Sequence, residues 1–143
     1  MADVTETVHI ERTPEEVWDY FTNIANDPEW SPMTTRSEKT SEGPLGVGTT
    51  FTVDRKQSGP TRMEYVEYTR PSRWVLKGSA KPASFTYSAT LAASGAGTDL
   101  TSRMQLEPKG TYKLMSPFMN GFVSKQLRQV HEALKRKLES AAG

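Results

Sequence analysis

The sequence predicts an α+β protein in which a six- or seven-stranded antiparallel sheet packs against one long C-terminal helix. Between about residues 34 and 106, strand-length runs alternate with Gly- and Pro-containing turns, too closely spaced for crossover helices. From Ser116 to about Ser140, apolar residues recur at helical spacing. The chain has 143 residues with no linker or internal repeat, so we expect a single domain over residues 1–143.

The N-terminal segment predicts one strand followed by two short helices. Residues 4–10 alternate apolar and polar side chains, which is typical of a half-buried strand. The next segment, Thr-Pro-Glu-Glu at 13–16, is a helix start in which Thr caps, Pro suits the first helical position and the second Glu completes a capping box. We expect helices near 14–22 and 24–30, the latter bounded by prolines.

The central part of the chain predicts a meander of strands separated by turns. The expected strands cover residues 49–56, 61–69, 73–77, 84–92 and 98–106. One strand carries apolar side chains on both faces, because Met63 and Tyr65 have the opposite parity to Val66 and Tyr68. A bulge would explain this pattern, and so would an outer face covered in a dimer; the sequence leaves both open.

The last element predicts one long amphipathic helix near residues 112–140. Its apolar stripe has spacings of 4, 4, 3, 4 and 4 and consists of Met119, Val123, Leu127, Val130, Leu134 and Leu138. About 24 residues of such a helix span roughly 36 Å, and the sheet is the surface large enough to cover them. Lys125, Arg128, Lys135 and Arg136 lie off the stripe, so we expect them in solvent.

Composition and motifs exclude several classes of site. The chain has no cysteine, which excludes disulfides, thiolate zinc sites and a cysteine nucleophile. Its two histidines, His9 and His131, are too few for a histidine-built metal site, so no metal is expected. No G-x-S-x-G, P-loop or complete G-x-G-x-x-G pattern occurs, which leaves no nucleophile elbow or nucleotide site and no expected cofactor.

Charge and hydropathy predict a cytoplasmic protein. No apolar run reaches the roughly 18 residues of a membrane span, and Asp3 and Glu6 replace the apolar core of a signal peptide. Acidic residues outnumber basic ones in residues 1–71, and the reverse holds in residues 72–143. The basic residues concentrate in the long helix, where they solvate its outer face. We therefore expect no nucleic-acid partner and no integral membrane association.

Five short motifs together resemble one known family. They lie, in this order, at residues 13–21 (TPEEVWDYF), 27–30 (DPEW), 46–49 (GVGT), 66–71 (VEYTRP) and 97–101 (GTDLT). This order resembles the polyketide cyclase/dehydratase-like members of the START/Bet v 1-like (SRPBCC) superfamily, over essentially the whole chain. The resemblance implies the helix-grip fold, in which a curved sheet wraps a long helix around an apolar cavity. That family includes polyketide aromatase/cyclases as well as lipid and hormone carriers.

A cavity of this kind needs apolar walls with a few placed polar groups. The candidate ligand-binding residues are Trp30, Phe51, Val53, Trp74, Leu76, Phe85, Tyr87, Met104, Met115, Met119 and Phe122. Methionines adapt to varied ligand shapes, although they and the aromatic residues also fill ordinary cores. In the family resembled, the tryptophan matching Trp30 lies at the cavity entrance; here it could equally seal the base of the long helix. We expect the cavity and its gate under residues 110–123.

Two residues are candidates for chemistry in that cavity. The resemblance implies that Arg, Tyr and Ser or Thr side chains orient a poly-ketone, and Arg55 and Tyr87 are the residues we single out. Arg55 shares its strand face with two apolar wall candidates, whereas Arg103 alternates with apolar neighbours and is expected in solvent. A strand-end salt bridge is the alternative role for Arg55.

The predicted function is binding of a small hydrophobic or aromatic ligand, lipid- or polyketide-like, by a monomer or homodimer. Two alternatives stay open: a polyketide aromatase/cyclase or dehydratase, and an interaction module that uses the basic C-terminal helix. Polar groups facing inward, above all Arg55 and Tyr87, would favour chemistry, whereas an entirely apolar wall would favour carriage. The sequence itself favours binding over catalysis.

Overall fold

Seven antiparallel strands form one sheet in the order β1-β7-β6-β5-β4-β3-β2. They are β1 (Ala2–Ile10), β2 (Thr34–Lys39), β3 (Thr50–Arg55), β4 (Gly59–Thr69), β5 (Arg73–Ser79), β6 (Ala83–Ser94) and β7 (Gly97–Pro108). In this computed structural model, residues 1–56 and 58–140 are described, without the side chains of residues 115 and 116. The N-terminal strand pairs with the last strand, which brings the two ends of the chain's β region together.

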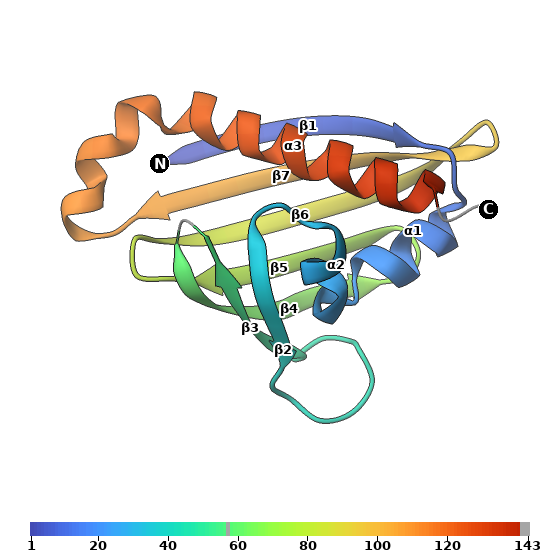
Figure 1. Ribbon diagram of the computed structural model, residues 1–143, viewed down its shortest axis with the longest axis horizontal. Helices are drawn as coiled ribbons and strands as arrows, with labels where there is room; N and C mark the ends of the chain where they lie inside the picture. The colour runs from blue at the N-terminus through green and yellow to red at the C-terminus, as the bar shows by residue number, and fades with distance from the viewer. Residues whose placement is uncertain (57, 141–143) are drawn as a thin grey trace.

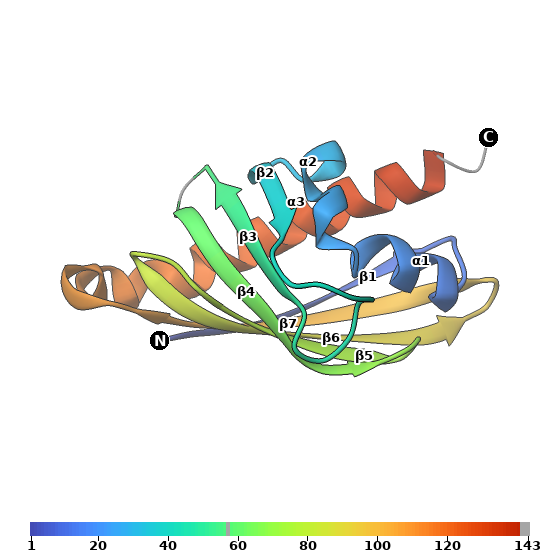
Figure 2. The same cartoon turned by 90° about the horizontal axis from the view of Figure 1, so that it is seen from below.

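The helices lie on the concave side of the curved sheet, except for one 3₁₀ segment that lies beyond the end of β7 (Figures 1 and 2). They are α1 (Pro14–Phe21), the 3₁₀ turn η1 (Ile24–Asn26), α2 (Asp27–Trp30), the 3₁₀ segment η2 (Gly110–Phe118) and α3 (Met119–Ser140). The expected capping box starts α1, since the Glu16 amide donates to Thr13 Oγ1 and the Thr13 amide donates to the Glu16 carboxylate. The helix-grip architecture is therefore confirmed. No helix of the described residues is long and apolar enough to cross a bilayer.

The long helix is shorter than expected, because residues 110–118 form η2 in place of α-helix. Pro117 has no amide hydrogen to donate to a carbonyl of the preceding turn. The α-helical hydrogen-bond pattern therefore cannot continue through Pro117 toward the N-terminus of the segment. The segment also has little buried surface to support it: Leu114 is 81% exposed and Phe118 74% exposed. The regular helix therefore begins only at Met119.

The buried face of α3 differs from the predicted stripe at two positions, since Met119 is only partly buried and His131 takes the place of Val130. Its buried residues are Val123, Leu127, His131, Leu134 and Leu138. Val130 is only partly buried, so the central place against the sheet belongs to the histidine beside it.

His131 ends a chain of buried hydrogen bonds that crosses the core. Its Nε2 lies 2.7 Å from Ser102 Oγ in β7, and Ser102 Oγ lies 2.6 Å from the Tyr87 hydroxyl in β6. Each of these three polar atoms therefore has a hydrogen-bond partner, so the core can hold the histidine without leaving any of them unsatisfied. Burial lowers the pKa of His131 to about 4, against a smaller opposing effect of Glu6, so the ring is neutral at pH 7.

Lys135, expected in solvent, is instead half-buried. Its Nζ donates to the His9 carbonyl at 2.6 Å and to the Glu139 carboxylate at 2.9 Å. A lysine can extend its aliphatic stem along the helix while its ammonium group reaches a polar partner. In this position it links α3 to the end of β1.

A bulge explains the apolar residues on both faces of β4. The pairing of β4 with β5 shifts between Tyr65 and Glu67, which leaves Val66 as an extra residue that is 39% exposed. The shift returns Tyr68 to the inner face, where its ring packs edge-on against Trp18 at a centroid distance of 4.9 Å. The bulge accounts for the pattern within a single chain.

Truncation of the buried leucines of α3 will destabilise the fold. Leu127→Ala and Leu134→Ala should each lower the free energy of unfolding by about 2–5 kcal/mol, because each removes buried methyl groups from the helix–sheet contact. Arg136→Ala, at an exposed position of the same helix, should change it by less than about 0.5 kcal/mol. Urea unfolding measures all three, and equal effects would mean that this face of α3 does not pack on the sheet.

The buried neutral state of His131 will make stability fall in acid. Between the unfolded pKa near 6.5 and the folded pKa of about 4, the unfolded chain binds a proton that the folded chain does not, so stability decreases as the pH falls through this range. His131→Leu removes this effect. From pH 7 to pH 4.5, urea unfolding should show wild type losing about 2 kcal/mol relative to the variant. Parallel pH curves for the two proteins would contradict this assignment.

Candidate ligand-binding cavity

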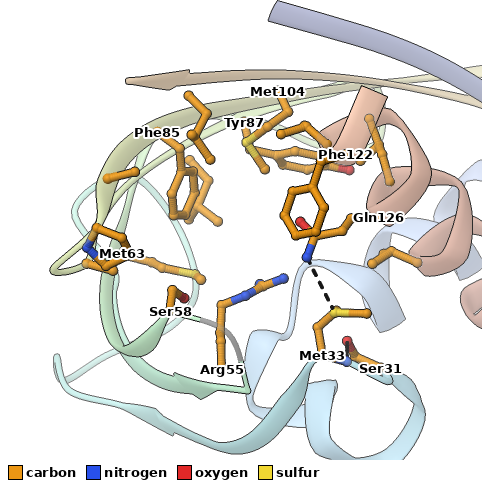
Figure 3. A pocket seen from close by; sticks show the side chains of 18 of the residues that line it. Ser31, Met33, Arg55, Ser58, Met63, Phe85, Tyr87, Met104, Phe122 and Gln126 are labelled. Carbon is orange, nitrogen blue, oxygen red and sulfur yellow. Dashed lines mark hydrogen bonds between the residues drawn. The ribbon is translucent and has the colours of Figure 1, made fainter. Parts of the chain in front are cut away.

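A cavity of about 670 Å³ lies between the concave face of the sheet and α3. Its lining comes from the end of α1, η1, α2, strands β3 to β7, η2 and the N-terminal half of α3. The volume falls within the range of pockets that take drug-sized ligands. Figure 3 shows how side chains from the sheet and from α3 point into this common space.

Most of the predicted wall residues line the cavity. These are Trp30, Trp74, Leu76, Phe85, Tyr87, Met104, Met119 and Phe122. Phe51 and Val53 do not: both are fully buried in the core, and the ring of Tyr65 packs against Phe51 at a centroid distance of 6.1 Å. The alternation of the strand correctly predicted that both side chains face inward, but other core side chains fill the space in front of them. The side chain of Met115 lies outside the described residues.

The cavity reaches the surface where η2 meets α3. Three lining residues there, Tyr112, Phe118 and Phe122, are 44%, 74% and 52% exposed. The space lies under residues 110–123, as predicted, and extends further along α3 to Leu127 and Val130.

Aromatic rings form the floor at the opposite side. Trp74 meets Trp18 at 5.0 Å and Phe21 at 5.3 Å, and Phe21 meets Trp30 at 5.6 Å, all in edge-on geometry. Such contacts fix the orientation of large side chains. Trp30 therefore lines the cavity wall and also packs into the ring cluster beneath the short helices. Its Nε1 is buried and has no hydrogen-bond partner in the described part of the chain.

Arg55 extends from the end of β3 into the cavity (Figure 3). Within the described residues its guanidinium forms no hydrogen bond and no ion pair, so the salt bridge considered from the sequence is not formed there. Burial lowers the pKa of its guanidinium, and the nearby Asp27 carboxyl raises it. A guanidinium carries five donors, and those of Arg55 are therefore available to groups in the cavity.

Asp27, which the sequence analysis did not single out, lines the cavity near Arg55. Its Oδ1 is out of contact with solvent and has no hydrogen-bond partner among the described residues. Burial raises the pKa of Asp27 to about 7, although Arg55 acts to lower it. The sequence shows only two acidic residues, Asp27 and Glu29, in one short helical segment. This pattern does not reveal that β3 brings an arginine close to Asp27.

Two tyrosines on the cavity wall already have partners for their hydroxyl groups. The Tyr65 hydroxyl donates to the Thr22 carbonyl at 2.6 Å, and the Tyr87 hydroxyl shares the hydrogen bond with Ser102. Arg103 lies outside, as expected, where it pairs with Asp3 at 2.7 Å. The charged side chains in the described part of the lining are those of Asp27 and Arg55, and neither makes such an internal bond.

The described residues contain no cluster of histidine and acidic side chains suited to a metal ion. His9, the other histidine, lies on β1 between Asp99 and Glu11 at 2.8 and 2.6 Å. These hydrogen bonds, that to Asp99 first, raise the pKa of His9 above its usual value. His9 and these two carboxylates therefore lie outside the cavity lining.

Solved structures with the same fold include proteins of different kinds. A START superfamily protein from Mycobacterium smegmatis matches with a TM-score of 0.85 and 14% identity, over 99% of both chains. The di-domain ARO/CYC StfQ from the steffimycin biosynthetic pathway matches with a TM-score of 0.79 and 16% identity; the match covers 99% of this chain and 52% of StfQ. At these identities the likeness shows the fold alone.

Sequence comparison identifies the family directly. A search of curated proteins found no match. The family described as polyketide cyclase / dehydrase and lipid transport matches residues 1–139. This match confirms the resemblance expected from the five motifs. The chain belongs to the polyketide cyclase / dehydrase and lipid transport family.

Proposed function

We propose that this protein binds a small hydrophobic or aromatic molecule in the cavity, with an oxygen of the ligand at Arg55. The observation that carries the proposal is one cationic side chain, without an internal partner, aimed into an otherwise mainly apolar space of about 670 Å³. A ligand with a ring system and at least one acceptor oxygen fits both features.

The apolar wall supplies the affinity in this proposal. Rings and methionines face the space from both sides, among them Trp74 and Phe85 on the sheet and Met119 and Phe122 on α3. Burial of apolar ligand surface contributes about 25 cal/mol per Å², and methionine side chains adjust to ligands of different outline. This wall supports binding of rings or acyl chains and little discrimination among them.

Arg55 supplies the orientation. A buried guanidinium that lacks hydrogen bonds is costly, and water or a ligand oxygen must satisfy its donors. A ligand oxygen at this position removes the cost and fixes which end of the ligand enters first. The family description, which includes lipid transport as well as cyclase and dehydrase activity, is compatible with such a site.

Catalysis on a keto compound is the second candidate, and one observation favours it. Asp27 has a pKa of about 7, which is near the optimum for a general base at neutral pH. With Arg55 holding a ketone oxygen, Asp27 would take the proton from the adjacent carbon and Arg55 would stabilise the resulting enolate. Tyr87, the other residue considered for chemistry, has its hydroxyl hydrogen-bonded to Ser102, which favours Asp27 as the acid–base group.

The third candidate, an interaction surface on the basic helix, has less support. Two basic residues of α3 lie against acidic residues of the same chain: Arg128 at 3.9 Å from Glu6 and Lys135 at 2.9 Å from Glu139. Charges that are matched within the fold are less available to an acidic partner.

Met119→Trp will weaken ligand binding without unfolding the protein. The larger ring fills the space below α3, so the affinity for the neutral dye Nile red should fall at least tenfold in a fluorescence titration. Val47→Trp, in an exposed loop outside the cavity lining, is the matched control and should bind the dye as wild type does. Equal affinity in all three proteins would contradict binding in this cavity.

Asp27→Asn separates carriage from catalysis. If the protein is a cyclase or dehydratase, wild type should convert a soluble β-triketone mimic to an aromatic product, which ultraviolet absorbance measures. The variant should lose that turnover while still binding Nile red. Turnover that persists in Asp27→Asn would exclude the proposed acid–base role. Binding without turnover in wild type is the result expected of a carrier.

A further inference from the structure

We propose that Asp27 and Arg55 make the cavity selective for hydrophobic carboxylates, and that Asp27 takes up a proton when such a carboxylate binds. The inference rests on the proposed function, since it concerns a ligand in the same cavity. It specifies that the ligand carries a negative charge and that the protein takes up a proton when this ligand binds.

The two side chains share the cavity without pairing directly. Both line it, yet no hydrogen bond or ion pair joins them within the described residues, and Asp27 Oδ1 is buried with no partner. Each nevertheless acts on the other's pKa through its charge. Arg55 thus keeps its donors directed into the cavity, where the parallel N–H groups of a guanidinium match the two oxygens of a carboxylate.

The charge balance then requires a proton. With Asp27 ionised, the pair is neutral overall; an added carboxylate would leave one net negative charge in a largely apolar space, which is unfavourable. Protonation of Asp27 removes that charge and leaves the carboxylate paired with Arg55. Because burial already raises the pKa of Asp27 to about 7, this proton is gained near neutral pH.

Asp27 is the group expected to titrate in this range. Besides Arg55, the titratable groups on which the charge of Asp27 acts are Tyr20, Tyr65 and Tyr87, from α1, β4 and β6. Burial raises the pKa of Tyr20 to about 12 and that of the other two above its usual value, so all three stay neutral. In the described part of the chain, β2 and α3, which also pack against α2, contribute no charged side chain to the lining.

Size-matched probes test the ligand charge. Isothermal titration calorimetry with 2-naphthoate and with neutral 2-acetylnaphthalene, at pH 6.5 and pH 8.5, measures both affinities. We expect the affinity for 2-naphthoate to fall at least tenfold between these pH values, because the proton is scarcer at the higher pH. The affinity for 2-acetylnaphthalene should not fall.

Buffers of different ionisation enthalpy measure the proton itself. At pH 8, titration in phosphate and in Tris should show uptake of close to one proton per 2-naphthoate and almost none with the neutral probe. Asp27→Asn should bind 2-naphthoate with no proton uptake and with a pH-independent affinity. Glu29→Gln, which changes an exposed carboxylate in the same helix, is the matched control and should behave as wild type.

Two results would overturn the inference: binding of 2-naphthoate to wild type without proton uptake, or an unchanged pH dependence in Asp27→Asn. The wild-type buffer series decides the question even if Asp27→Asn does not fold. Failure of the proposed function has a different signature, because then neither naphthalene probe nor Nile red would bind at any pH.

Discussion

The packing of α3 on the concave face of the sheet is the contact on which the rest of the structure depends. An isolated sheet with one apolar face is not stable in water, and α3 is the element long enough to cover it. Leu134 is completely buried in this contact, and Lys135 fastens the same part of the helix to the end of β1. With α3 fixed in this place, the short helices close the other part of the concave face (Figure 2).

The same helix both fills the core and leaves the cavity, because its two halves carry different residues. The C-terminal half presents leucines that meet the sheet, whereas the N-terminal half presents Met119 and Phe122 above an open space. Stability is thereby concentrated at one end of the molecule. The other end, joined to the largely exposed η2, lines the cavity.

The elements of the fold were predictable because their signals are local. Alternation in strands and the four-three spacing of a helix depend on near neighbours, and the motifs fixed their order. What the sequence did not reveal depends on contacts between distant segments. Phe51 has the right parity but faces filled core. His131 lies on the buried face, where it meets Ser102 of β7. Asp27 lies in the cavity near Arg55, which belongs to a distant strand. The bulge that separates Tyr65 from Tyr68 likewise needs the register of β5 to be known.

A crystal structure of the protein with its tightest-binding ligand would test this account most directly. We expect the apolar body of the ligand to lie between the N-terminal half of α3 and the inner face of β5 and β6, with a ligand oxygen within hydrogen-bond distance of the Arg55 guanidinium. A ligand bound on the outer surface, or one inside the cavity whose oxygens avoid Arg55 while that side chain turns to solvent, would contradict it.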